Sequence, residues 1–255
     1  MDGLGRAGPL LFGFGIALLG VENVVCARSR IAVIGPGTTD LLVPVLPWLP
    51  PIQWLGYVIG LTLAIGGVCV AADYFGRQGA LLIGTVLFVA ALALQVPSAY
   101  SHLYNLSIRT TLFELIALGS AAVVYGGGDL AGPFRMVFAI ATIVFGIDHF
   151  QAIPFIASLV PSWLPFHRGM ARLTGAALVA AGFTMATGLW AQLGATWLGI
   201  MFLLWFFVLH VPRALSEGGR HNPAEWSSAF IALAMAGASW ILAESFRRSL
   251  RRRAW

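Results

Sequence analysis

The most regular feature of the chain is a series of long apolar runs, separated by short breaks that are polar or rich in glycine and proline. Each run holds about 20 residues with few charges, the length that an α-helix needs to cross about 30 Å of hydrocarbon. The runs lack the polar–apolar alternation of membrane β-barrels. The pattern therefore predicts spanning helices at residues 8–27, 54–74, 78–98, 109–126, 133–150, 169–189, 193–213 and 224–246.

The composition leads to the same fold class. Of 255 residues, 59% are hydrophobic and only 10% are charged, whereas soluble domains contain about 25% charged residues. A soluble protein of this size could not bury so much apolar surface, but a bilayer can accommodate it. We therefore predict an all-α, polytopic membrane protein with about eight transmembrane helices.

The chain also matches itself when it is shifted by 115 residues. Three short motifs recur at this one offset: WLP at 48 and 163, VP at 96 and 211, and IAL at 116 and 231. The first helices align with a shift of 126, because the segment after the first helix is 11 residues longer than its counterpart. This indicates an internal duplication, with one four-helix unit over residues 1–128 and a second over 129–255.

Each predicted unit holds an even number of helices, so the two units enter the membrane in the same orientation. Such parallel repeats are related by a pseudo-two-fold axis along the membrane normal, and both termini lie on one face. The inverted repeats of many transporters need an odd number of helices in each unit, which disfavours transport. The proline-rich segments VPVLPWLPP and SLVPSWLPF are too broken to span, so we expect them at the interface, with Trp48 and Trp163 at headgroup depth.

The charges favour a membrane surface over a nucleic acid as partner. All basic residues are arginine, and the formal net charge is +5. Five arginines fall in the last nine residues, 247–255, and no basic stripe with interleaved aromatic residues occurs elsewhere. A basic tail is typical of the cytoplasmic side, next to anionic lipid. We therefore expect a multi-pass protein of the inner (cytoplasmic) membrane with cytoplasmic termini.

Polar residues gather in the leaflet opposite the termini. Helices that run away from the terminal face carry polar side chains near their far ends: Glu22, Asn23, Gln95, Asp148, His149 and His210. Glu114 and Glu225 lie near the start of returning helices, and the remaining histidines lie in loops on the same side. The leaflet on the side of the termini holds almost no polar residues, so we expect this terminal half of the membrane region to be functionally inert. Because an ionisable group in hydrocarbon costs about 2.5–3.5 kcal/mol, each needs a partner, a wet cavity or a function.

Several of these residues are candidates for binding a cofactor. Asp148 and His149 are either solvated at a helix end or form a carboxylate–imidazole pair that binds a cofactor or relays protons. His210 either bonds the carbonyl freed by a nearby proline or, beside Trp205, donates to a quinone. Glu114 either forms an interhelical ion pair, with an arginine or a histidine, or belongs to the same site.

The sequence offers little for other chemistry. His149 and His210 on separate helices are a weak basis for a haem or a metal ion, so we favour a quinone, and metal ligands cannot be assigned. The chain has no phosphate loop, nucleotide-binding motif or hydrolase triad. We therefore expect that the protein is not catalytic on its own.

Each half of the chain resembles the DoxX-like family of membrane proteins. The likeness rests on Gly-x-x-polar closing the first helix, a proline-broken loop, a glycine-rich second helix, and a third helix that ends in His210-Val211-Pro212 before HNPAEW. It covers nearly the whole chain, once per half, and is better in the second half. The chain departs from the family in being duplicated and in having Asn23 and His149 where the family has lysine.

The resemblance implies a link to quinone-coupled sulfur oxidation and other membrane redox complexes. We expect an accessory membrane subunit of a redox or energy-transducing complex, with other membrane subunits as partners and a quinone or lipid bound in the polar leaflet. The expected cofactor-binding residues are His149, His210, Asp148, Glu114 and Trp205. The alternatives are a structural or assembly protein without a cofactor, and a proton or small-solute pathway through the carboxylates.

Overall fold

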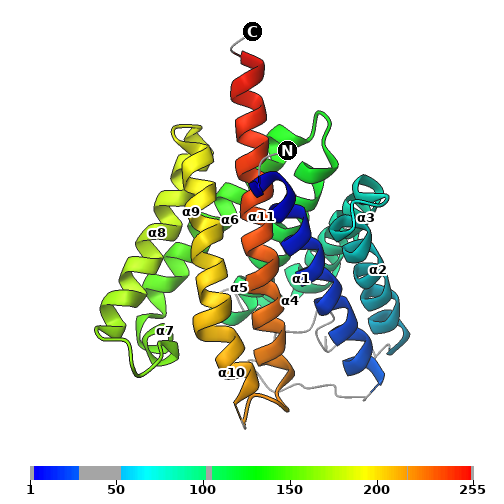
Figure 1. Ribbon diagram of the computed structural model, residues 1–255. Coiled ribbons are helices and arrows are strands. Elements are labelled where there is room, and N and C mark those ends of the chain that lie inside the picture. Colours follow the sequence, from blue (N-terminus) through cyan, green and yellow to red (C-terminus); the bar gives the residue numbers. More distant parts are fainter. Residues whose placement is uncertain (1–2, 29–52, 102–104, 217, 254–255) are drawn as a thin grey trace.

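The computed structural model describes residues 3–28, 53–101, 105–216 and 218–253, and this part of the chain is helical without strands (Figure 1). Long helices follow one another along the chain: α1 (Gly3–Arg28), α2 (Gln53–Ala71), α3 (Gly76–Ala90), α5 (Leu106–Gly126), α6 (Ala131–Gln151), α8 (His167–Thr187), α9 (Ala191–Trp205) and α11 (Pro223–Arg253). Shorter helical segments are η1 (Ala91–Gln95), α4 (Val96–Ser101), α7 (Ile153–Leu159), η2 (Phe206–His210) and α10 (Val211–Leu215).

Eight helices in the described residues are long and apolar enough to cross a membrane. The prediction of an all-α, polytopic membrane protein is therefore confirmed. Each predicted span overlaps one of these helices, with ends that differ by a few residues, because hydropathy marks the apolar interior of a helix but not its last turns. The protein is a multi-pass membrane protein, and its environment is a lipid bilayer.

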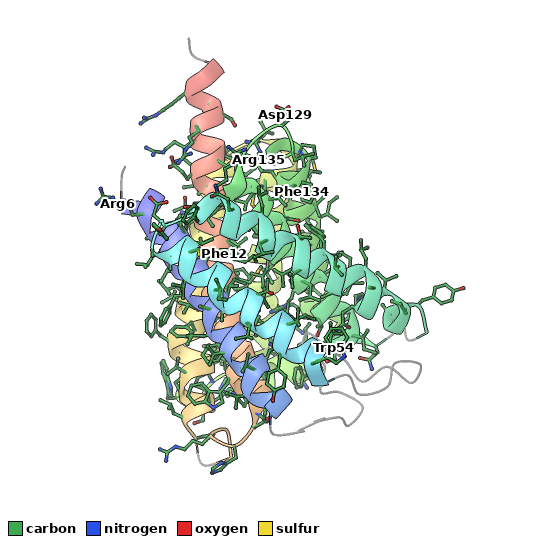
Figure 2. All side chains as sticks on the ribbon, turned by 90° about the vertical axis from the view of Figure 1, so that its right-hand side faces the viewer. Arg6, Phe12, Trp54, Asp129, Phe134 and Arg135 are labelled. Atoms are coloured by element: carbon green, nitrogen blue, oxygen red, sulfur yellow. The ribbon has the colours of Figure 1, made fainter. Side chains whose placement is uncertain are left out.

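The two sets of four helices interlock. The first helix of each set packs against the second helix of its own set, α1 on α2 and α6 on α8, and against the fourth helix of the other set, α1 on α11 and α6 on α5. Figure 1 shows α11 through the middle of the bundle and both termini at one end, the terminal end. Arg6, Asp129 and Arg135 lie at this end and Trp54 lies toward the opposite end (Figure 2).

Glycines allow the first and second helices to touch backbone to backbone. A Cβ atom at Gly67 on α2 would lie 2.5 Å from the carbonyl oxygen of Gly13 and 2.6 Å from the amide nitrogen of Ala17, both on α1. The second set repeats this contact, since a Cβ atom at Gly146 on α6 would lie 2.7 Å from the carbonyl oxygen of Gly175 on α8. Such small-residue contacts are the usual basis of helix association in lipid.

In each set, a five-residue π-helical segment interrupts the third helix, η1 in the first set and η2 in the second. In both, the valine amide after the segment donates to a carbonyl five residues back, from Val96 to Ala91 and from Val211 to Phe206. A proline follows each valine. Because proline lacks an N–H and its ring clashes with the carbonyl four residues earlier, a wider turn relieves the clash. The same rare turn recurs at an offset of 115 residues, but the duplication and its boundary at residue 128 stay predictions.

The second proline-rich segment, SLVPSWLPF, forms a turn outside the long helices, as predicted, and a short helix that was not expected precedes this turn. α7 has seven residues, too few to span a membrane. Trp163, in the turn between α7 and α8, is 71% exposed. The first proline-rich segment, with Trp48, lies outside the described residues.

The contact between α1 and α2 can be tested with Gly67→Ala. The added methyl group would push the two backbones apart, so we expect the free energy of unfolding to fall by about 1–3 kcal/mol. Thermal or denaturant unfolding in detergent measures this. Gly169→Ala on α8 is the matched control, because its Cβ atom would lie 3.6 Å from the nearest atom, an ordinary contact. Equal stability of the two variants would contradict the packing described.

Candidate functional site

The buried carboxylate of Asp148 joins the two sets of helices. Asp148 on α6 forms an ion pair with Arg109 on α5, in which Nε donates to Oδ1 at 2.9 Å and one Nη donates to the same oxygen. Thr110 donates to the other carboxylate oxygen at 3.4 Å, and Arg109 also donates to Gln151 at 2.7 Å. This carboxylate is therefore held by several donors from a neighbouring helix.

The imidazole of His149 points elsewhere, although His149 follows Asp148 on the same helix. Its Nδ1 lies 2.8 Å from the carbonyl oxygen of Phe145. Its ring stacks on the indole of Trp205 on α9, with centroids 5.5 Å apart and planes at 15°. Neighbouring positions on a helix are about 100° apart, which separates the two side chains. The structure therefore gives Asp148 and His149 separate partners instead of one carboxylate–imidazole pair.

The hydrogen bond at Nδ1 of His149 determines whether the other ring nitrogen, Nε2, donates or accepts. A carbonyl oxygen only accepts, so Nδ1 carries the hydrogen. In the neutral imidazole, Nε2 is then an acceptor. His149 is half-buried, and this Nδ1 contact is its only hydrogen bond to the described residues. The ring therefore keeps one acceptor nitrogen that no described residue uses, beside the indole of Trp205.

His210 lies at the end of η2, five residues beyond Trp205 on the same continuous helix. It is half-buried and close to a second ion pair, in which Arg213 on α10 donates from Nε to Glu225 on α11 at 2.9 Å. The structure thus brings His149 and Trp205 into contact, and His210 follows Trp205 five residues later in the chain.

Glu114 belongs to a different helix. It is half-buried on α5, five residues beyond Arg109, whose guanidinium is directed at Asp148. Among the described residues, no three His, Cys, Asp or Glu side chains are grouped so that they could hold a metal ion.

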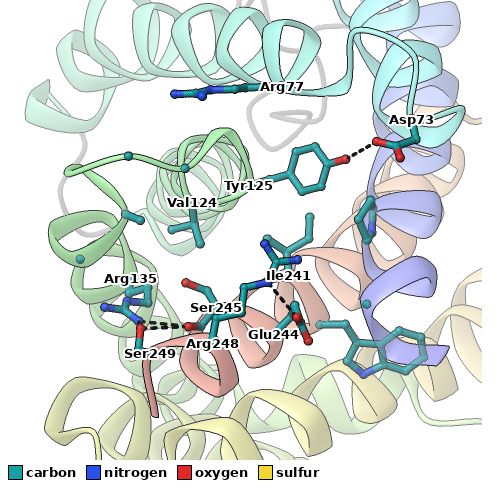
Figure 3. A pocket seen from close by; sticks show the side chains of 17 residues that line it. Asp73, Arg77, Val124, Tyr125, Arg135, Ile241, Glu244, Ser245, Arg248 and Ser249 are labelled. Carbon is teal, nitrogen blue, oxygen red and sulfur yellow. Dashed lines mark hydrogen bonds and ion pairs between the residues drawn. The ribbon is translucent and has the colours of Figure 1, made fainter. Parts of the chain in front are cut away.

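The expectation that the terminal half is inert is wrong. At that end Tyr125 donates to Asp73 at 3.2 Å, and Arg135 donates to Ser249 at 2.7 Å. Glu244 accepts from the two arginines that follow it on α11, at 2.7 and 2.8 Å. These groups line or border a cavity of about 510 Å³ (Figure 3).

The sequence held a signal for this second polar region. Arg135, Tyr125 and Glu244 all stand inside predicted spans, within a few residues of the end that faces the terminal side. Aligning the helices by their terminal ends places these three residues in one layer.

Comparison with protein-family models, with curated proteins and with solved structures gives no match for this chain. The fold and the geometry of the site define a polytopic α-helical membrane protein.

The ion pair between Arg109 and Asp148 can be tested with Arg109→Gln. The carboxylate side chain is 8% exposed and the arginine side chain 27% exposed. Removing the arginine leaves a buried charge without its main partner, so we expect a loss of about 3–5 kcal/mol of stability. Unfolding in detergent measures it.

The double variant Arg109→Gln/Asp148→Asn serves as the rescue, because it removes both charges, and it should recover most of the loss. Arg168→Gln, which replaces an exposed arginine at the start of α8, is the control. A single variant as stable as that control would show that the pair is not a structural link.

Proposed function

We propose that this protein is an accessory, non-catalytic subunit of a membrane redox or energy-transducing complex, and that it binds a quinone in the leaflet away from the termini. The observation that carries the proposal is the stacked pair of His149 and Trp205. The redox setting comes from the resemblance of each half to DoxX-like units. Partner subunits in the same membrane belong to this proposal.

The hydrogen-bonding role of His149 favours the reduced form of the quinone. With Nδ1 donating to the Phe145 carbonyl, Nε2 accepts, and a quinol hydroxyl is a donor. A quinone carbonyl only accepts and finds no partner on the neutral ring. An aromatic headgroup suits the aromatic surroundings of His149, which include Trp205 and, against it, Phe202. The long apolar tail of a quinol would stay in lipid, beside exposed side chains such as Phe207.

The carboxylates favour a binding role over catalysis or proton transfer. Asp148 is engaged by Arg109, and Glu225 by Arg213. Each of these carboxylates is occupied by an arginine and joins two helical segments. The pathway through acidic residues is therefore the weaker alternative.

A structural or assembly role without a cofactor is the second candidate. It is favoured by the same ion pairs, because Arg109 and Asp148 connect the first set of helices to the second. In this alternative, the polar residues hold the bundle together and the histidines pack.

The proposed orientation places the termini in the cytoplasm and the chain in the inner membrane. The last turns of α11 carry several arginines, which are retained on the cytoplasmic side of membranes. The His149 and Trp205 pair would then lie in the outer leaflet of that membrane.

Bound quinone tests the proposal directly. The protein purified in a mild detergent should contain extractable quinone or quinol, and His149→Ala should reduce it about tenfold, because it removes the acceptor and the stacking partner. His221→Ala, an exposed histidine on the same side, is the matched control and should keep full occupancy. Equal quinone in both variants, or none in the native protein, would favour the structural role instead.

A further inference from the structure

The polar cavity at the terminal end is built from several separate elements. Its walls include Arg77 on α3, Tyr125 on α5, Arg135 on α6 and Arg248 on α11. Figure 3 shows Arg77 on one side of the view, and Arg135 and Arg248 on the other. Side chains distant in sequence therefore converge on one space of about 510 Å³.

An apolar cavity of about 870 Å³ adjoins the polar one. The two share Gly132, Arg135 and Ser249 in their walls. The apolar cavity is otherwise lined mainly by hydrophobic side chains of α6, α8, α9 and α11, among them Met136, Met185, Leu193, Phe246 and Leu250. Arg135 thus lies between the polar cavity and the apolar cavity, and its guanidinium is 4.9 Å from the ring centroid of Phe246.

The charges of the polar cavity favour an anion. Three arginines face two carboxylates, Asp73 and Glu244, and both carboxylates already accept hydrogen bonds. Arg77 is exposed and makes no hydrogen bond or ion pair with the described residues. A cationic side chain directed at open space is available to a ligand.

The start of α6 adds a second source of positive potential. Gly127, Gly128, Ala131 and Gly132 border the cavity where this 21-residue helix begins. The residue before the helix, Leu130, provides no side-chain cap. Ala131 already donates to the carbonyl of Gly128 at 3.2 Å and Pro133 has no N–H, which leaves the amide of Gly132 as the donor of this first turn. That amide and the positive end of the helix dipole add to the attraction for an anion.

We propose that the paired cavities bind one anionic phospholipid, with its phosphate headgroup between Arg77 and Arg135 and an acyl chain in the apolar cavity. A charged space joined to an apolar space at one arginine matches the chemistry of an amphiphile. A soluble phosphate ester would leave the apolar cavity unused. The site is separate from the proposed quinone site, which lies at the other end of the bundle.

Lipid binding to the purified full-length protein tests this proposal. Native mass spectrometry would compare dioleoyl phosphatidylglycerol with the zwitterionic dioleoyl phosphatidylcholine. We expect the anionic lipid to bind more tightly, and Arg77→Gln/Arg135→Gln to weaken it about tenfold, because hydrogen bonds to charged groups are lost. The control is Arg6→Gln/Arg251→Gln, which removes two exposed arginines from the same end that line neither cavity, and it should change affinity less than about twofold.

Two further variants test the polar cavity and the apolar cavity one at a time. Arg77→Gln alone removes no hydrogen bond or ion pair with the described residues, so we expect its unfolding to match that of the native protein while its lipid affinity falls. Met136→Trp narrows the apolar cavity and should weaken the long-chain lipid more than a dibutanoyl phosphatidylglycerol. Equal affinity for both headgroups, or equal losses in the test and control variants, would overturn the proposal. Displacement of the lipid by inorganic phosphate, with Met136→Trp having no effect, would replace it with a soluble phosphate site.

Discussion

Helices in lipid gain nothing from hiding apolar side chains from the apolar solvent around them, and this protein is organised by that constraint. What remains to hold helices together is close packing, together with polar contacts that find no substitute in hydrocarbon. Gly13 and Gly67 let α1 and α2 meet along their backbones. Gly237 does the same between α11 and α1, since a Cβ atom there would lie 2.6 Å from the carbonyl oxygen of Gly8.

The interlocked arrangement follows from these contacts. α1 has glycines on two sides, Gly13 toward α2 and Gly15 toward α11, so it can pack against its own second helix and against the fourth helix of the other set. α6 meets its own second helix, α8, in the same way at Gly146. Polar residues then occupy the two ends, where they serve different purposes. The pair of Arg109 and Asp148 connects the two sets, while His149 and Trp205 present a hydrogen-bond acceptor beside a flat aromatic surface.

The sequence predicted the spans well because bilayer thickness fixes how long an apolar run must be, and charge is excluded from its middle. It predicted the polar layer around His149 and His210 for the same reason. It did not identify the partner of Asp148, because Arg109 lies 39 residues away on another helix and no local pattern specifies that contact. The π-helical turns were also not predicted, although Pro97 and Pro212 mark their positions. The cavity at the terminal end depends on side chains from at least four helices, and only the fold brings them together.

The eight spans place both termini and the loop at Asp129 on one side of the membrane, with the loops near Ser162 and Asn222 on the other. Single cysteines test this topology most directly, in a background with Cys26→Ser and Cys69→Ser, in sealed vesicles of known orientation. A membrane-impermeant maleimide added outside should label Gly3→Cys and Asp129→Cys together, and Ser162→Cys and Asn222→Cys only in vesicles of the opposite orientation. Labelling of Asp129→Cys and Asn222→Cys from the same side would contradict this topology.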